Sequence, residues 1–229
     1  MAQKNFLDFL MKPKNWWLPL MIIFTISFSG VFMIGLHTYT EAPPIPNFTT
    51  QEGDPVFTHD DVMDGQKVFQ KYALMEYGSM FGDGANRGPD YSAEALHYTA
   101  EFMADYYLKS ITTKSEDQTF QRYGISELVK KEIKSNQYQA SDNTVKLTDA
   151  QSFAANELIA YYMAVFTSSS HPQSFKPKGY ITNQNEIRSL TAFFFWSSWV
   201  CGVERPGKDY SYTHNWPYDP SAGNAPSSA

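Results

Sequence analysis

The sequence predicts a mainly α-helical protein, with one N-terminal transmembrane helix followed by a helical domain. Two observations support this fold class. Near the N-terminus 21 consecutive residues carry no charge, and further along the chain apolar residues recur at spacings of three or four, the period of a helix face. The remainder of the 229 residues has the length of one ordinary domain.

The uncharged block extends from Trp16 to Leu36, and we assign residues 16–38 to a membrane anchor. A helix of this length spans the hydrocarbon core of a bilayer, which is about 30 Å thick. A cleaved signal peptide is the alternative. We prefer a retained anchor because the block is longer than a signal peptide requires, and the following LHTYTEAPP contains no small-residue cleavage site.

The flanks of the block predict its orientation. Trp16 and Trp17 open it, where aromatic residues commonly lie at a membrane surface. Basic residues precede the block and none closely follows it, so we expect residues 1–15 to be cytoplasmic. These basic residues are Lys4, Lys12 and Lys14.

Composition divides the rest of the chain into three segments. Residues 39–58 include the proline-rich EAPPIPN and are predicted to be an extended linker. Residues 59–205 carry the helical periodicity and are predicted to be the domain. Residues 206–229 are rich in Tyr, Trp, Pro, Ser and Gly without periodicity, which predicts an extended tail.

Caps and periodicity predict the first two helices of the domain. Asp60 or Asp61 is expected to cap a helix that continues to Gly78, where the turn-rich GDGANRGPD follows. A second helix is expected to begin at Ser92, because apolar residues then recur along one face. They are Leu96, Ala100, Met103, Tyr107 and Ile111.

The next segments are a charged helix, a turn and a capped helix. Residues 120–133 are predicted to form the charged helix, and residues 142–147 a polar turn with a strand of two or three residues. The capping-box pattern Thr148-Asp-Ala-Gln151 then predicts a fourth helix, which the polar stretch 167–177 ends.

A fifth helix has a wide aromatic surface. Asn183 is expected to cap it, with Glu186 three residues on, and Arg205-Pro206-Gly207 to end it. A second membrane span is the alternative, but the uncharged run 189–203 is shorter than the roughly 20 residues that a span needs. We therefore expect this helix to pack in the core or to rest on the membrane surface.

Composition excludes several functions. Acidic residues outnumber basic ones by 24 to 18, which argues against nucleic-acid binding. Cys201 is the only cysteine in the sequence, so the chain has no internal disulfide, no cysteine zinc cluster and no C-x-x-C-H haem attachment site.

No motif of an independent enzyme is present. The histidines are scattered without metal-ligand spacing, and no serine, threonine or cysteine has the context of a nucleophile. The loop GDGANRGPD lacks the lysine of a phosphate cradle and the alternating acids of a calcium loop, which favours a structured turn. The histidines are His37, His59, His97, His171 and His214.

Two features remain open from residues alone. His37 lies at the outer end of the anchor, where its imidazole could meet a quinol headgroup or simply be solvated. The aromatic residues of 193–199, with Tyr161 and Tyr162, are more often core than cofactor site.

Three stretches carry a family resemblance. They are GQKVFQKYALMEYGSMFGDGANRGPDYSAEALH (65–97), LTAFFFWSSWVCGVERPGKDYSYTHNWPYDP (190–220) and the anchor before them. Together they resemble the N-terminal part of quinol-dependent nitric oxide reductase, in which a cytochrome-c-like domain precedes the catalytic membrane domain. The resemblance implies that 59–205 has a cytochrome-c-like fold.

The resemblance also implies that this domain holds no c haem. In relatives that use cytochrome c, the corresponding segment reads C-x-x-C-H. Here the two cysteine positions are Leu74 and Tyr77, and the histidine position is Gly78. Electrons are therefore not expected to enter through a c haem.

A calcium site is a further implication of the resemblance. In the family the loop that follows lies over haem propionates and contributes to a calcium-binding corner, which would place the Gly84 carbonyl and the Asn86 side chain near the ion. The sequence departs from the family pattern, with Asn86 where tyrosine is usual and Asp83 where glutamate or histidine is common.

The resemblance implies a larger enzyme that reduces two nitric oxide molecules to nitrous oxide and water. Its catalytic domain would carry b-type haems and non-haem iron, take electrons from the quinol pool, and follow residue 229, so this chain is expected to cap and assemble without an active site of its own. Membrane lipid is the other expected partner. The expected location is a bacterial inner membrane, with the domain in the periplasm.

Two alternatives belong to other classes of protein. The chain could be a separate anchored subunit or binding module that docks on a catalytic chain, with its aromatic helix and tail as the interface. An anchored electron-transfer cytochrome is disfavoured by the missing attachment cysteines.

Overall fold

The computed structural model describes residue 9 and residues 12–85, 87–110, 118–167 and 179–226. The chain forms two compact units, Met1–Pro43 and Pro44–Ala229. Each unit is described by itself.

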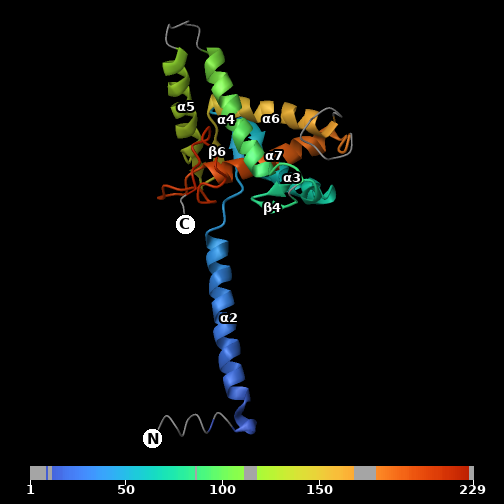
Figure 1. Ribbon diagram of the computed structural model, residues 1–229, viewed down its shortest axis with the longest axis vertical. Coiled ribbons are helices and arrows are strands. Elements are labelled where there is room, and N and C mark those ends of the chain that lie inside the picture. Colours follow the sequence, from blue (N-terminus) through green and yellow to red (C-terminus); the bar gives the residue numbers. More distant parts are fainter. Residues whose placement is uncertain (1–8, 10–11, 86, 111–117, 168–178, 227–229) are drawn as a thin grey trace. The chain divides into compact units, whose positions relative to one another are not determined.

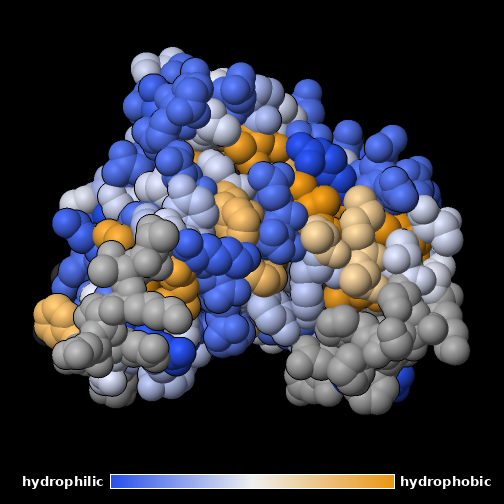
Figure 2. Space-filling model, turned by 90° about the horizontal axis from the view of Figure 1, so that it is seen from above, coloured by the Kyte–Doolittle hydropathy of each residue, from blue (hydrophilic) through white to orange (hydrophobic). Residues whose placement is uncertain are grey.

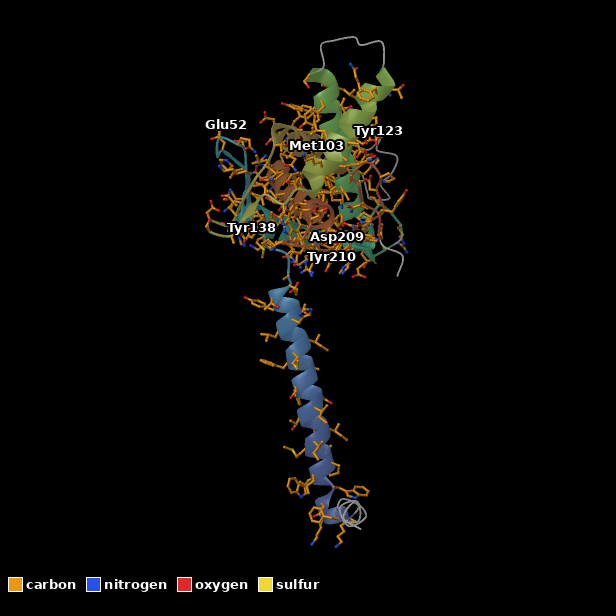
Figure 3. All side chains as sticks on the ribbon, turned by 90° about the vertical axis from the view of Figure 1, so that its left-hand side faces the viewer. Glu52, Met103, Tyr123, Tyr138, Asp209 and Tyr210 are labelled. Carbon is orange, nitrogen blue, oxygen red and sulfur yellow. The ribbon has the colours of Figure 1, made fainter. Side chains whose placement is uncertain are left out.

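The first unit consists of a short 3₁₀ helix, η1 (Pro13–Asn15), and one long helix, α2 (Trp17–Thr40). No residue of α2 is buried, and its side chains project on every side (Figure 3). The Thr25 and Thr38 hydroxyls donate to the carbonyls of Met21 and Ile34, at 2.8 and 2.9 Å. Even its polar side chains are thus bonded within the helix, as a lipid environment requires.

This helix is long and apolar enough to cross a membrane, the single such helix in the described part of the chain. Its bounds differ from the predicted span, 16–38, by one residue at the start and two at the end.

Five longer helices build the second unit (Figure 1). The α4 and α5 helices pack side by side, and α7 packs against α3, α4 and α6. The helices are α3 (His59–Lys71), α4 (Tyr91–Ser110), α5 (Gln118–Lys134), α6 (Asp149–Thr167) and α7 (Gln184–Gly202).

The fifth predicted helix is α7, which is the core helix of the domain. Thirteen of its 19 residues are buried, and Phe194 and Leu190 are fully inaccessible. Asn183 caps it as predicted, because its Oδ1 accepts from the amides of Asn185 and Glu186. Between core and membrane surface, the structure places this helix in the core.

The first domain helix starts and ends earlier than predicted. Thr58, not Asp60 or Asp61, is the N-cap of α3; it forms a capping box with Asp61, whose carboxylate accepts from the Thr58 amide at 2.8 Å. The helix ends at Lys71 instead of continuing to Gly78, and Ala73 adopts a left-handed conformation with φ 47°. That conformation cannot continue a right-handed helix.

The predicted linker 39–58 is wrong for its second half. Strands β1 (Asn47–Thr49) and β2 (Pro55–Phe57) join β6 (Thr144–Lys146) and β5 (Tyr138–Gln139) in a sheet of order β2-β1-β6-β5. Phe48 and Phe57 are fully buried against the aromatic side of α7. Burial of two phenylalanines stabilises a segment whose prolines alone predict an open spacer.

The prediction of an extended tail, 206–229, is also wrong for the residues described. Ser211, Ala222 and Asn224 are buried. The Asn224 amide donates to the Cys201 carbonyl at 3.0 Å, and the Lys134 ammonium donates to Asn215 Oδ1 at 3.0 Å. Side-chain hydrogen bonds, which leave no periodic trace in sequence, fold this segment onto the domain.

Seen along the view of Figure 2, the domain surface is mostly hydrophilic, and its hydrophobic residues appear in separate patches. Exposed large apolar residues outside α2 are few among those described: Phe9, Met75, Leu108, Phe120, Tyr123, Leu128 and Tyr218, with Trp16 just before α2. Met103 points into the interior from α4, whereas Tyr123 projects from α5 (Figure 3).

Candidate functional site

The turn after α3 contains the three positions at which the family resemblance places haem attachment. Leu74 begins the 3₁₀ helix η2 (Leu74–Glu76) and is fully buried in the main core. Tyr77 is half-buried, with its ring 5.1 Å from that of Tyr180. The two positions where cysteines would stand thus hold packed side chains.

Gly78, at the histidine position, has no room for a side chain. A Cβ there would lie 2.4 Å from the Pro89 carbonyl oxygen and 2.8 Å from the Tyr91 ring. Backbone and ring occupy the space into which a ligand at this position would have to project.

Aromatic rings fill the region beside this turn. Tyr91 stacks on Phe194 with ring centroids 4.8 Å apart, and Phe69 meets Tyr91 edge-on at 5.9 Å. Tyr162 lies 4.9 Å from Phe194 on another side. Burial raises the pKa of Tyr91, so its phenol stays neutral.

Glu94 adds a carboxylate to the aromatic cluster. Its oxygens accept from the Tyr161 and Tyr162 hydroxyls, at 2.9 and 3.2 Å. Burial first, and the negative charge of Glu94 second, raise the pKa of both tyrosines. Both phenols therefore remain hydrogen-bond donors to this carboxylate, which lies one turn into α4.

A hairpin follows the turn, formed by β3 (Ser79–Met80) and β4 (Asp83–Gly84). Gly84 has φ +140°, and a Cβ there would lie 2.5 Å from the Gly78 carbonyl oxygen. The structure thus brings together two of the predicted positions, Gly78 and Gly84, through a backbone approach that only glycine permits.

Asp90 holds the hairpin to α4. Its Oδ2 accepts from the Ser79 hydroxyl and the Gly82 amide, both at 2.8 Å. Its Oδ1 accepts from the amides of Ser92 and Ala93, at 3.0 and 2.9 Å, and so caps α4. Four hydrogen bonds use the full acceptor capacity of a carboxylate, so Asp90 is a structural hub and a poor metal ligand.

The predicted calcium corner is described only in part. Gly84 lies in β4 and Asp83 is exposed beside it, whereas Asn86 lies outside the described residues. Among the residues that the structure describes, no group of three or more His, Cys, Asp or Glu side chains could hold a metal ion.

The described histidines lie apart. His59 contacts Asp60, with 3.2 Å between Nδ1 and Oδ1, and His214 stacks on Tyr210 at 4.7 Å. His97 lies between Asp219 and Glu101, at 3.0 and 3.6 Å. His37 is in the last turn of α2, and His171 lies outside the described residues.

Cys201 is no nucleophile in this structure. Its side chain is fully buried, and burial raises its pKa to about 12. The reactive form of cysteine is the thiolate, which such a thiol does not populate near neutral pH.

Sequence reasoning missed three residues that organise the site: Asp90, Glu94 and Lys134. Asp90 had a signal, because an aspartate two residues before Ser92 fits a helix N-cap. Glu94 and Lys134 had none, because their partners lie more than 60 residues away in the sequence.

The fold and the site define a small helical domain of cytochrome-like type, whose attachment turn is closed by packing and preceded by a helix long enough to span a membrane. A family model for the cytochrome c-like domain of a nitric oxide reductase matches residues 46–218. The chain belongs to this family. A search of the curated proteins finds no match.

Proposed function

We propose that the chain is the N-terminal part of a quinol-dependent nitric oxide reductase, in which it caps and helps to assemble the catalytic domain and carries no electrons itself. The observation that carries this proposal is the closed turn: Leu74 is core, and Gly78 is in contact with Pro89 and Tyr91. A donor that bypasses this domain, such as membrane quinol, accounts for its loss of a haem site.

The proposal includes a location. α2 is the anchor in a bacterial inner membrane, residues before it are cytoplasmic, and the domain is periplasmic. The support is the length and composition of α2 and the lysines before it. Membrane lipid is then a partner of α2, and the catalytic domain, with its b-type haems and non-haem iron, is the partner of the rest.

The closed turn can be tested by rebuilding the attachment motif. Leu74→Cys, Tyr77→Cys and Gly78→His would be combined and expressed with a c-haem maturation system. We expect no covalent haem on the purified full chain, because a side chain at position 78 meets Pro89 and Tyr91.

The matched control carries Leu74→Cys and Tyr77→Cys with Gly78 retained. Haem covalently bound to the triple variant, with the helical content unchanged, would show that the turn has room for a haem and would remove the main support for the proposal.

Calcium at Gly84 is part of the proposal and needs the partner. Calcium takes about six to eight oxygen ligands. The hairpin offers the exposed Asp83 and main-chain carbonyls, because Asp90 already accepts four hydrogen bonds. We expect calcium to bind the assembled enzyme and not the purified chain, as isothermal titration of both would show.

The separate-subunit form of the proposal differs in mass. An antibody against the domain, used on native membranes, would detect one band. A band near the 26.1 kDa of this chain supports a separate subunit, whereas a band about three times larger supports a fused reductase.

A further inference from the structure

A small cavity lies at the seam between the two apolar clusters of the domain. Its volume is about 20 Å³. Its apolar lining comes from α4, α5, α7 and the residue after β6, and all of these side chains are almost inaccessible to solvent. They are Leu96, Ile133, Leu147, Phe195 and Trp199.

Three polar residues complete the lining, and all three are already hydrogen-bonded. The Thr99 and Ser198 hydroxyls donate to the carbonyls of Ala95 and Phe195, both at 2.7 Å. A hydroxyl has one hydrogen, so neither has a donor left for a molecule in the cavity.

Gln151 lies at the edge of the cavity and is held in the same way. Its Oε1 accepts from the Thr148 amide at 3.0 Å, and its Nε2 donates to the Glu132 carbonyl at 3.4 Å. A water molecule needs two to four polar partners, which this lining supplies poorly.

We propose that this cavity binds one small, neutral diatomic molecule, and that nitric oxide is its occupant. The size fits, because about 10 to 15 Å³ on this scale holds one water molecule and the cavity is slightly larger. Nitric oxide forms only weak hydrogen bonds and loses little on leaving water, whereas water would lose most of its bonds.

The choice of nitric oxide, as opposed to another diatomic gas, rests on the proposed function. Binding is weak and exchange fast, because two atoms remove little apolar surface from water. The domain would then hold substrate transiently and raise its local amount near the membrane.

The test uses the full chain in detergent with methyl-labelled leucines, under nitric oxide without oxygen. Nitric oxide is paramagnetic and broadens the resonances of nearby methyl groups. We expect Leu96 and Leu147, which line the cavity, to broaden severalfold more than Leu158 and Leu190, which are equally buried outside its lining. Equal broadening of all four would overturn the proposal.

A pair of variants of α7 separates the cavity from the helix. Ser198→Val adds volume inside the cavity and should abolish the extra broadening of Leu96 and Leu147. Ser197→Val is the control, since Ser197 is as buried and its hydroxyl bonds the Phe194 carbonyl at 2.8 Å, but it does not line the cavity.

Extra broadening that persists in Ser198→Val would contradict the assignment of the site. Should either variant fail to fold, the leucine comparison in the unchanged chain still decides. Neither readout uses reductase activity, so a failure of the proposed function leaves the cavity result standing.

Discussion

Two apolar helices of this protein solve opposite problems. α2 has 24 residues, none of them buried, and α7 has 19 residues, of which thirteen are buried. The side chains of α2 face outward on all sides, as in a helix whose solvent is lipid. Those of α7 face inward, where α3, α4 and α6 cover them.

The difference shows that apolar content alone does not assign a helix to a membrane. The length of the uncharged run separates the two, because the run in α2 is long enough to cross a bilayer and the run in α7 is not. Their starts differ as well. Asn183 caps α7 with its side chain, whereas α2 has no side-chain cap.

A charge in the middle of each helix gives the largest expected contrast. Phe194→Asp places a carboxylate in the aromatic cluster and should destabilise the domain by about 5 kcal/mol or more, enough to unfold it. Phe28→Asp, in the middle of α2, should leave the domain folded and weaken membrane insertion by about 3 kcal/mol.

Limited proteolysis and membrane fractionation measure the two effects. The contrast between the helices fails if Phe28→Asp makes the domain protease-sensitive, or if Phe194→Asp leaves it resistant.

Glycine substitutions sharpen the same contrast. Gly65 of α3 lies against α7, and a Cβ there would lie 2.0 Å from the Ser189 carbonyl oxygen and 2.7 Å from Phe193 Cβ. Gly65→Ala should therefore cost about 2 kcal/mol through overpacking. Gly30 of α2 has nothing within 4 Å, so Gly30→Ala should leave domain stability unchanged.

Urea unfolding followed by near-ultraviolet circular dichroism would compare these two glycine variants. A midpoint unchanged in Gly65→Ala would mean that α3 and α7 do not approach as closely as described.

Alkaline pH tests the packing around α7. Burial raises the pKa of Tyr91 and Tyr162, which both pack on Phe194. Above pH 10 the unfolded chain loses these protons and the folded domain keeps them. Stability should therefore fall as pH rises, by up to about 1.4 kcal/mol per pH unit for each tyrosine.

Urea unfolding at a series of alkaline pH values would measure this slope. The double variant Tyr91→Phe, Tyr162→Phe should lose most of it, and Tyr218→Phe, an exposed control, should keep it. An unchanged slope in the double variant would contradict the packing assigned to the cluster.

The smallest expected effect is at the start of α7. Asn183→Ala removes the acceptor for two amides and should cost about 1 kcal/mol, whereas Asn183→Ser retains a cap and should cost less. Thermal unfolding of the two variants measures this difference. Equal melting temperatures would show that the cap contributes nothing to the helix.

Sequence reasoning predicted the elements with strong local signals. The span of α2, the capping box of α6 and the Asn183 cap of α7 are all confirmed, because each depends on residues close together in the chain. The strands β1 and β2 were missed. Each has three residues, too few to show a period, and the partner of β1 is almost 100 residues away.

The same distinction holds for the candidate site. The absence of attachment cysteines can be read directly at Leu74 and Tyr77. The closing of the turn by Pro89 and Tyr91, and the four bonds of Asp90, depend on how α4 packs against the hairpin. No pattern along the sequence encodes those contacts.

The central claim is that this domain belongs to a nitric oxide reductase whose electrons do not pass through it. The most direct measurement is nitric oxide consumption by the enzyme purified from native membranes through a tag on this chain, with quinol or reduced cytochrome c as donor. We expect consumption with quinol, none with cytochrome c, and no c-type haem spectrum. Consumption that requires cytochrome c, or a preparation that consumes no nitric oxide with either donor, would contradict the claim.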